Sequence, residues 1–170
     1  KEEYPINDVR LVNGDLNEDY VLGTYFGQKN CYYTLLSEIK IPQLDIGETF
    51  WIEAYSSLTE WDNSTNPQLK LYINEELIQG LDVNHRHTVV PEKFWGQKVS
   101  LRIEIFSGRE EKQFPMFIKA YKIDKATYNT YWDLRVAVEA WQAIEEDTYK
   151  LVYQETLLKC IKLLDFRQVY

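Results

Sequence analysis

Hydrophobic and polar side chains alternate along much of the first 123 residues, which predicts β-strands. In residues 98–105 every second position holds a branched aliphatic side chain: Val99, Leu101, Ile103 and Ile105. A two-residue period places such side chains on one face of a strand and leaves the other face to solvent. The same period recurs around residues 33–41, 50–54, 69–73 and 116–120.

Turn-forming residues separate these segments and indicate how they connect. Clusters of Gly, Asn, Asp and Pro follow each apolar run, and Asn74-Glu75-Glu76 is short enough for a tight hairpin with Asn74 in the left-handed region. Short strands divided by turns, without a helical period between them, are typical of antiparallel sandwiches. We therefore expect a mainly β fold, an antiparallel β-sandwich of the jelly-roll or galactose-binding-like kind.

The pattern changes after Ile123 to apolar residues at spacings of three and four, which predicts two amphipathic helices. Asp124 and Asp147 are the expected N-caps, and the apolar positions are Tyr131, Leu134, Val138, Trp141 and Ile144, then Leu151, Leu157, Leu158, Ile161 and Leu164. We expect a sandwich domain over residues 1–123 and a C-terminal helical hairpin over 124–170. The apolar faces predict that the hairpin packs on the sandwich or on a partner.

Aromatic residues make up 15% of the chain, with 5 Trp, 13 Tyr and 7 Phe. Packing in a sandwich core explains most of them. Exposed rings would instead offer flat surfaces on which the C–H faces of a sugar stack. Three tryptophans are candidates for this carbohydrate stacking, each with the alternative of a packed edge residue: Trp51, Trp61 and Trp95.

Charge and cysteine usage limit the partners and the compartment. A net charge of −8 argues against nucleic acid and against an anionic membrane surface. Cys31 and Cys160 fall in different predicted units, so we expect free thiols and a reducing, cytoplasmic location. No signal peptide is present. A start at Lys1 rather than Met and an end at Tyr170 within a helical pattern suggest a piece of a longer protein.

The segment from Gln79 to His87 (QGLDVNHRH) holds the most concentrated candidate chemistry. Gly80, Asp82, Asn84 and His85 could form a ligand or interface loop. Oxygen and imidazole groups also suit a divalent metal, with His87 as a further ligand, but the chain has only two histidines and we assign no metal here. The plainer alternative is a structural turn, in which Gly80 takes a special backbone conformation and Asp82 and Asn84 bind loop N–H groups.

Catalytic motifs are lacking elsewhere in the sequence. No serine or cysteine stands in a nucleophile elbow, and no glycine-rich phosphate loop occurs. The acidic pairs at 75–76, 110–111 and 145–146 are sequence neighbours, whereas a glycosidase pair must face each other across a cleft. We therefore name no catalytic residue.

The run Leu69-Lys70-Leu71-Tyr72-Ile73-Asn74, followed by Gln79-Gly80-Leu81-Asp82-Val83-Asn84-His85, resembles the N-terminal β-sandwich of glycoside hydrolase family 38 α-mannosidases of the cytosolic and vacuolar kind. Ile39-Lys40-Ile41-Pro42 and the later helix containing Asp133-Leu134 are also similar. The resemblance covers roughly residues 30–165. Two departures are Glu75, where the family has Gly, and Tyr32-Tyr33, where it has Trp-Phe.

The resemblance implies a non-catalytic domain of a retaining α-mannosidase. Such a domain would serve assembly with its own catalytic domain and the rim of the substrate cleft. A divalent metal, usually zinc, and mannose-containing oligosaccharides would belong to the parent enzyme, and no cofactor is expected in residues 1–170. The alternatives are an independent carbohydrate-binding module with exposed aromatics and a protein-interaction or oligomerisation domain built on the helices.

Overall fold

The computed structural model describes residues 2–56, 67–145 and 148–164. The chain divides into two compact units, Lys1–Asp124 and Lys125–Tyr170. Asp124 is the last residue of a strand and directly precedes the first helix, so the division lies one residue after the change in sequence pattern.

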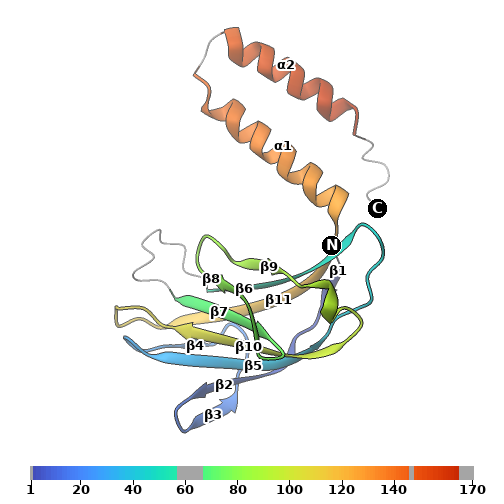
Figure 1. Ribbon diagram of the computed structural model, residues 1–170. Helices are drawn as coiled ribbons and strands as arrows, with labels where there is room; N and C mark the ends of the chain where they lie inside the picture. The colour runs from blue at the N-terminus through green and yellow to red at the C-terminus, as the bar shows by residue number, and fades with distance from the viewer. Residues whose placement is uncertain (1, 57–66, 146–147, 165–170) are drawn as a thin grey trace. The chain divides into compact units, whose positions relative to one another are not determined.

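The first unit is a sandwich of two antiparallel sheets (Figure 1). One sheet has the order β1-β11-β6-β9, with β4 pairing to β11: β1 (Glu2–Tyr4), β11 (Phe114–Asp124), β6 (Glu48–Ser56), β9 (His87–Val89) and β4 (Tyr25–Phe26). The six-stranded sheet has the order β3-β2-β5-β10-β7-β8: β3 (Leu16–Asp19), β2 (Asn7–Asn13), β5 (Tyr32–Lys40), β10 (Lys98–Phe106), β7 (Gln68–Ile73) and β8 (Glu76–Leu81). A short 3-10 helix, η1 (Glu92–Phe94), precedes β10. The predicted antiparallel β-sandwich is confirmed.

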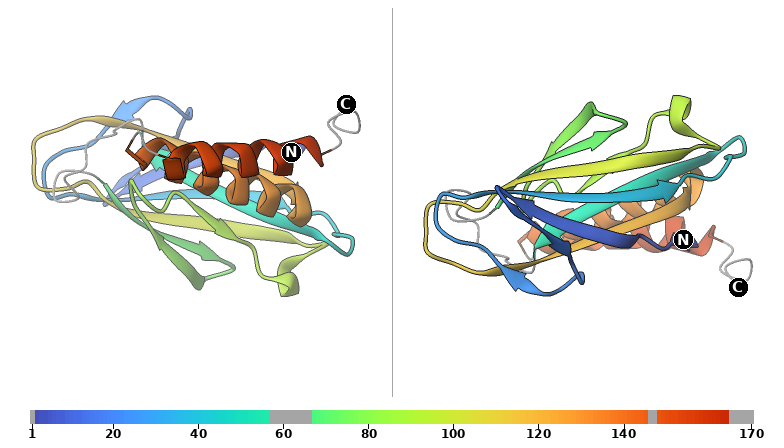
Figure 2. Two further views of the ribbon diagram at one scale, coloured as in Figure 1. Left: turned by 90° about the horizontal axis from the view of Figure 1, so that it is seen from above. Right: turned by 90° about the horizontal axis from the view of Figure 1, so that it is seen from below.

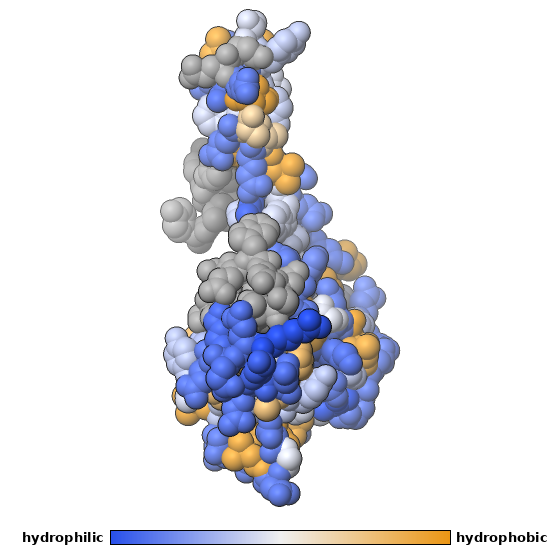
Figure 3. All heavy atoms as spheres, turned by 90° about the vertical axis from the view of Figure 1, so that its left-hand side faces the viewer, coloured by the Kyte–Doolittle hydropathy of each residue, from blue (hydrophilic) through white to orange (hydrophobic). Residues whose placement is uncertain are grey.

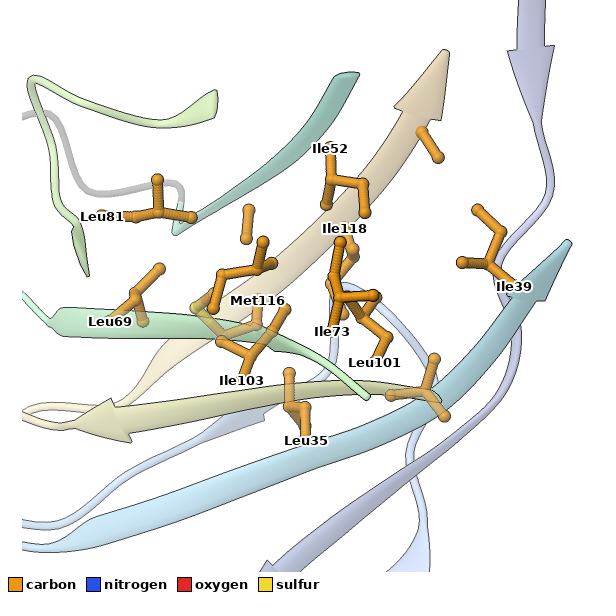
Figure 4. Packing of buried hydrophobic residues seen from close by; sticks show 14 of the residues in the cluster. Leu35, Ile39, Ile52, Leu69, Ile73, Leu81, Leu101, Ile103, Met116 and Ile118 are labelled. Atoms are coloured by element: carbon orange, nitrogen blue, oxygen red, sulfur yellow. The ribbon is translucent and has the colours of Figure 1, made fainter. Parts of the chain in front are cut away.

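The hydrophobic core lies between the two sheets, and the alternating residues of the sequence fill it (Figure 4). Ile52 of β6 and Met116 and Ile118 of β11 approach from one sheet, while Leu35 and Ile103 approach from the other. Burial of these aliphatic side chains is the main stabilising contribution to such a fold. Because the strand period is two, burial of one set of side chains of β5, β7 and β10 also fixes which other side chains of these strands face outward.

The β7–β8 hairpin closes through two residues, Asn74 and Glu75, with φ angles of 48° and 64°. Two positive φ angles are the mark of a type I′ turn, whose twist matches that of the paired strands. Asn74 Oδ1 accepts the backbone N–H of Ser100 at 2.9 Å and so ties the turn to β10. The tight hairpin predicted from the sequence is confirmed.

The second unit consists of α1 (Lys125–Ala143) and α2 (Thr148–Lys162), which lie side by side as a hairpin (Figure 1). Neither helix contains a buried residue, and Tyr131, Val136, Tyr149 and Leu151 are all more than half exposed. The predicted cap Asp147 lies outside the described residues. In the described part of the chain no helix combines the length and apolar character that crossing a membrane requires.

Candidate functional site

The outer face of the six-stranded sheet contains a shallow groove of about 400 Å³. It lies where β5 begins, β10 ends and β7 begins, next to edge strand β8; Figure 2 (right) views this sheet from its outer side. The side chains on its floor and rim alternate with core residues along the same strands. They are Tyr32, Gln68, Lys70, Glu104 and Phe106, with Gly80 leaving a gap beside Lys70.

Two aromatic rings form the apolar part of the groove. Tyr32 and Phe106 are cross-strand neighbours on β5 and β10, with ring centroids 5.1 Å apart and planes inclined at 39°. The Tyr32 side chain is 72% exposed, although the residue next to it, Tyr33, is 7% exposed in the core. Tyr32 therefore offers an aromatic ring to solvent beside the half-buried ring of Phe106, and the core of the fold does not need it.

Backbone contacts beyond the two rings hold them in place. Cys31 N–H donates to Ser107 Oγ at 3.0 Å, and Ser107 N–H donates to the Cys31 carbonyl at 2.9 Å. Ser107 is 1% exposed, and its hydroxyl also donates to the Gln28 carbonyl. These bonds continue the β5–β10 pairing past Tyr32 and Phe106, so the rings stand on a backbone that is fixed on both sides.

Glu104 is a satisfied carboxylate in the groove. It accepts a hydrogen bond from the Tyr72 hydroxyl at 3.1 Å and pairs with the Arg102 guanidinium. The Arg102 pKa is raised: burial lowers it, but the Glu75 and Glu104 carboxylates outweigh that effect. Lys70, opposite Glu104 in the ladder, makes no ion pair among the described residues, so its ammonium is an open donor.

Gly80 lies within strand β8, opposite Lys70, and its φ angle is not positive. The sequence-based interpretation that Gly80 adopts a conformation closed to other residues is therefore wrong. A Cβ atom at this position would meet only the Leu69 carbonyl oxygen, at an ordinary 3.8 Å. What the glycine provides is space: any longer side chain there would project over the groove from the edge of the sheet.

Asp82, Asn84 and His85 form a structural turn between β8 and β9, where the chain passes from one sheet to the other. Asp82 Oδ1 accepts the backbone N–H groups of Asn84 and His85, both at 2.8 Å, and lies 3.3 Å from His85 Nδ1. Burial of Asp82 raises its pKa, but the N–H groups of His85 and Asn84 outweigh burial and leave the pKa below its usual range. These contacts agree with the turn interpretation for Asp82.

No metal site is formed by this segment. His85 is in the turn, whereas His87 begins β9 and packs on Trp51, so the two imidazoles do not share a strand face. Within residues 2–56, 67–145 and 148–164 no group of three His, Cys, Asp or Glu side chains could hold a metal ion. The zinc that the mannosidase resemblance implies belongs to the parent enzyme's catalytic domain and stays a prediction.

Two of the three tryptophan candidates, Trp51 and Trp95, lie within the described residues. Trp51 lies on β6, is 9% exposed and has its ring centroid 4.6 Å from that of His87. Trp95 follows η1, packs against the core and donates its Nε1–H to the Val90 carbonyl at 3.3 Å. Trp61 lies outside the described residues. Neither Trp51 nor Trp95 lines the groove, and of the other candidates within the described residues only Gly80 does.

Sequence reasoning missed Tyr32 and Phe106, although a signal was present. In the alternating strands 32–40 and 98–106 the odd residues fill the core, so aromatic residues at positions 32 and 106 had to face solvent. Their pairing depends on the register of β5 against β10, which the sequence does not contain. The end of the sandwich viewed in Figure 3 shows hydrophobic side chains in small groups among hydrophilic ones, without one large apolar patch.

No family model matches the chain, and no curated protein sequence matches it. Among solved structures, the native structure of a family 35 carbohydrate binding module from Clostridium thermocellum is similar at 12% identity and a TM-score of 0.33. That alignment covers 70% of this chain and 95% of the module. A similarity at this level assigns the chain to no family, so its function has to be argued from the groove.

Proposed function

We propose that the β-sandwich is a carbohydrate-binding module that holds a glycan in the groove beside Tyr32 and Phe106. The exposed Tyr32 ring, packed on the half-buried ring of Phe106, is the observation on which this proposal rests. The C–H face of a pyranose is apolar and flat, and it stacks on aromatic rings whose polar edge remains in water. The hydroxyl groups at the rim of the same sugar need hydrogen-bond partners within reach.

The polar lining of the groove supplies such partners. The Lys70 ammonium is a donor, and Glu104 is an acceptor whose charge Arg102 already balances. Few polar groups around an apolar surface are typical of small-molecule sites, and a volume of about 400 Å³ lies within their usual size. The groove has an open, exposed floor, which suits binding of a soluble chain better than enclosure of a reacting bond.

Replacing Tyr32 by Ala tests the proposal directly. Affinity electrophoresis of the full chain on soluble mannan, xylan and glucan identifies a bound polysaccharide, and calorimetry measures the affinity. Loss of one stacked ring weakens binding roughly tenfold. Tyr25→Ala is the matched control, because Tyr25 is 62% exposed on β4 and does not line the groove. Equal affinity of the two variants, or no binding to any of the polysaccharides, would contradict the proposal.

A role as the non-catalytic N-terminal domain of an α-mannosidase remains a prediction from sequence resemblance. The type I′ turn at Asn74-Glu75 agrees with a hairpin at the resembling motif, but this turn type occurs in many β proteins. The prediction is that the purified chain does not hydrolyse an aryl α-mannoside. Turnover that increases with added zinc would overturn the non-catalytic assignment.

A further inference from the structure

A second groove, of about 490 Å³, lies on the same outer face at the other end of β5 and β10. Its lining includes Arg10 of β2, Leu36, Glu38 and Lys40 of β5, and Lys98 of β10. Lys98 pairs with Glu38 at 2.6 Å, whereas Arg10 and Lys40 make no ion pair among the described residues. This groove therefore presents open donors, as the aromatic groove does at Lys70.

A bulge in β2 opens the second groove. The register against β5 shifts between Asn7 and Arg10, and Asp8 within the shift has a φ angle of 52°. The Asn7 carbonyl accepts a hydrogen bond from Ser37 Oγ at 2.7 Å, so the bulge is anchored to β5. A bulge bends a strand locally and redirects its side chains. Here it interrupts the regular β2–β5 pairing beside Leu36 and Glu38.

The two grooves are nearly continuous along β5. Tyr32 lines the first and Leu36 lines the second, and only Thr34 faces outward between them. Four residues of a strand span roughly 13 Å, and the whole run from Tyr32 to Lys40 spans roughly 26 Å. A single sugar ring fills a small part of that length, whereas an extended oligosaccharide would cover it.

The surface between the grooves is low and flat. Arg102, opposite Leu36 in the ladder, has its guanidinium carbon 3.7 Å from the ring centroid of Tyr72. Glu75 and Glu104 hold the guanidinium there from two sides, and the Arg102 side chain is only 21% exposed. The side chain therefore lies along the sheet, and no long side chain from β10 stands up across the path.

We propose that this face binds an internal stretch of an extended glycan chain, which stacks on Tyr32 and Phe106 and whose far hydroxyl oxygens accept hydrogen bonds from Arg10 and Lys40. This inference rests on the proposed glycan-binding function and names the ligand class as a linear chain rather than a terminal sugar. When two subsites adjoin, the affinity for a ligand increases with the length of that ligand, because each further contact is made by a ligand that is already bound.

An oligosaccharide ladder tests the inference. The polysaccharide bound most tightly by the full chain is hydrolysed, and calorimetry compares its disaccharide with progressively longer oligomers. We expect affinity to rise roughly tenfold or more until the oligomer covers both grooves and then to level off. Arg10→Ala combined with Lys40→Ala should remove that gain while leaving disaccharide affinity unchanged. Lys159→Ala on α2, exposed and outside both grooves, is the matched control.

The outcomes separate the two proposals. A disaccharide bound as tightly as the longest oligomer would overturn the extended-chain inference and leave the Tyr32 groove as a site for a short ligand. A length dependence that survives in the Arg10/Lys40 double variant would also overturn it. Absence of binding to any oligomer would instead overturn the glycan-binding function itself. Amide chemical shifts of Arg10 and Lys40 give a second measurement, since only the longer oligomers should move them.

Discussion

The guanidinium of Arg102 lies over the ring of Tyr72, with 3.7 Å between its central carbon and the ring centroid. Both residues face outward on neighbouring strands, β10 and β7, as direct ladder partners. Glu75, in the β7–β8 turn, binds the same guanidinium through Oε2 at 2.9 Å from Nη2 and 3.0 Å from Nε. The Arg102 side chain thus links strand β10, strand β7 and the β7–β8 turn.

Arg102→Ala should lower the free energy of unfolding by about 1–2 kcal/mol, because it removes a cation–π contact and two partly exposed ion pairs. Arg102→Lys should recover only part of this loss, since an ammonium lacks the planar fork that contacts both carboxylates. Chemical denaturation measures both. Lys98→Ala, in an exposed pair with Glu38, is the control and should change stability by about 0.5 kcal/mol at most. Equal losses for Arg102→Ala and Lys98→Ala would contradict this account.

Glu75→Gly should raise the melting temperature. Glu75 has a φ angle of 64°, which costs a residue with a Cβ roughly 1 kcal/mol and costs glycine nothing. The lost contact to Arg102 offsets part of that gain only, because the Glu75 side chain is 71% exposed. Glu76→Gly makes the contrast, since Glu76 is a strand residue and glycine there should destabilise the hairpin. A lower melting temperature for Glu75→Gly would show that the ion pair outweighs the backbone strain.

Gly80→Gln should abolish glycan binding without harming the fold. The position has ordinary strand geometry with space for a Cβ, and replacing a strand glycine adds roughly 0.5–1 kcal/mol of stability. The longer side chain would cover the floor beside Lys70. Gly80→Ala should weaken binding less than Gly80→Gln does. The comparison distinguishes blockage of the groove by a long side chain from an effect of losing the glycine itself. Calorimetry and thermal unfolding of the same two variants give both quantities. Unchanged affinity in Gly80→Gln would exclude this end of the sheet from the binding surface.

Asp82→Asn should reduce the acid sensitivity of the protein. The folded-state pKa of Asp82 is below its unfolded value of about 3.9, so its stabilising contribution is full above the unfolded pKa and is lost as the pH falls through the folded pKa. Stability measured by denaturation should favour the wild type above pH 4 and converge toward Asp82→Asn at lower pH. A constant difference across that range would show that the carboxylate charge plays no part in the turn.

The sequence predicted the architecture because alternation is a local property. The alternating apolar residues Val99, Leu101 and Ile103 are enough to predict a half-buried strand. Asn74 likewise predicts the turn that follows Ile73. The groove depends on non-local register: Tyr32 meets Phe106 across 74 positions of the chain only because Lys98 pairs with Lys40 at the far end of the same ladder. The sequence motif instead indicated a site at Asp82 and His85. In the structure the Asp82 carboxylate accepts backbone N–H groups of the turn, including that of His85.

The geometry of Gly80 has an evolutionary consequence. Most glycines that shape a binding surface are locked in by their backbone, as Gly27 is here, where a Cβ would lie 2.8 Å from the Phe114 ring at a φ angle of 126°. Gly80 is under no such restraint. Mutation at this one codon can narrow, reshape or close the recognition surface while the fold remains as stable as before. A descendant of this sandwich could therefore change the shape of the proposed binding groove in a single step, without a compensating change elsewhere.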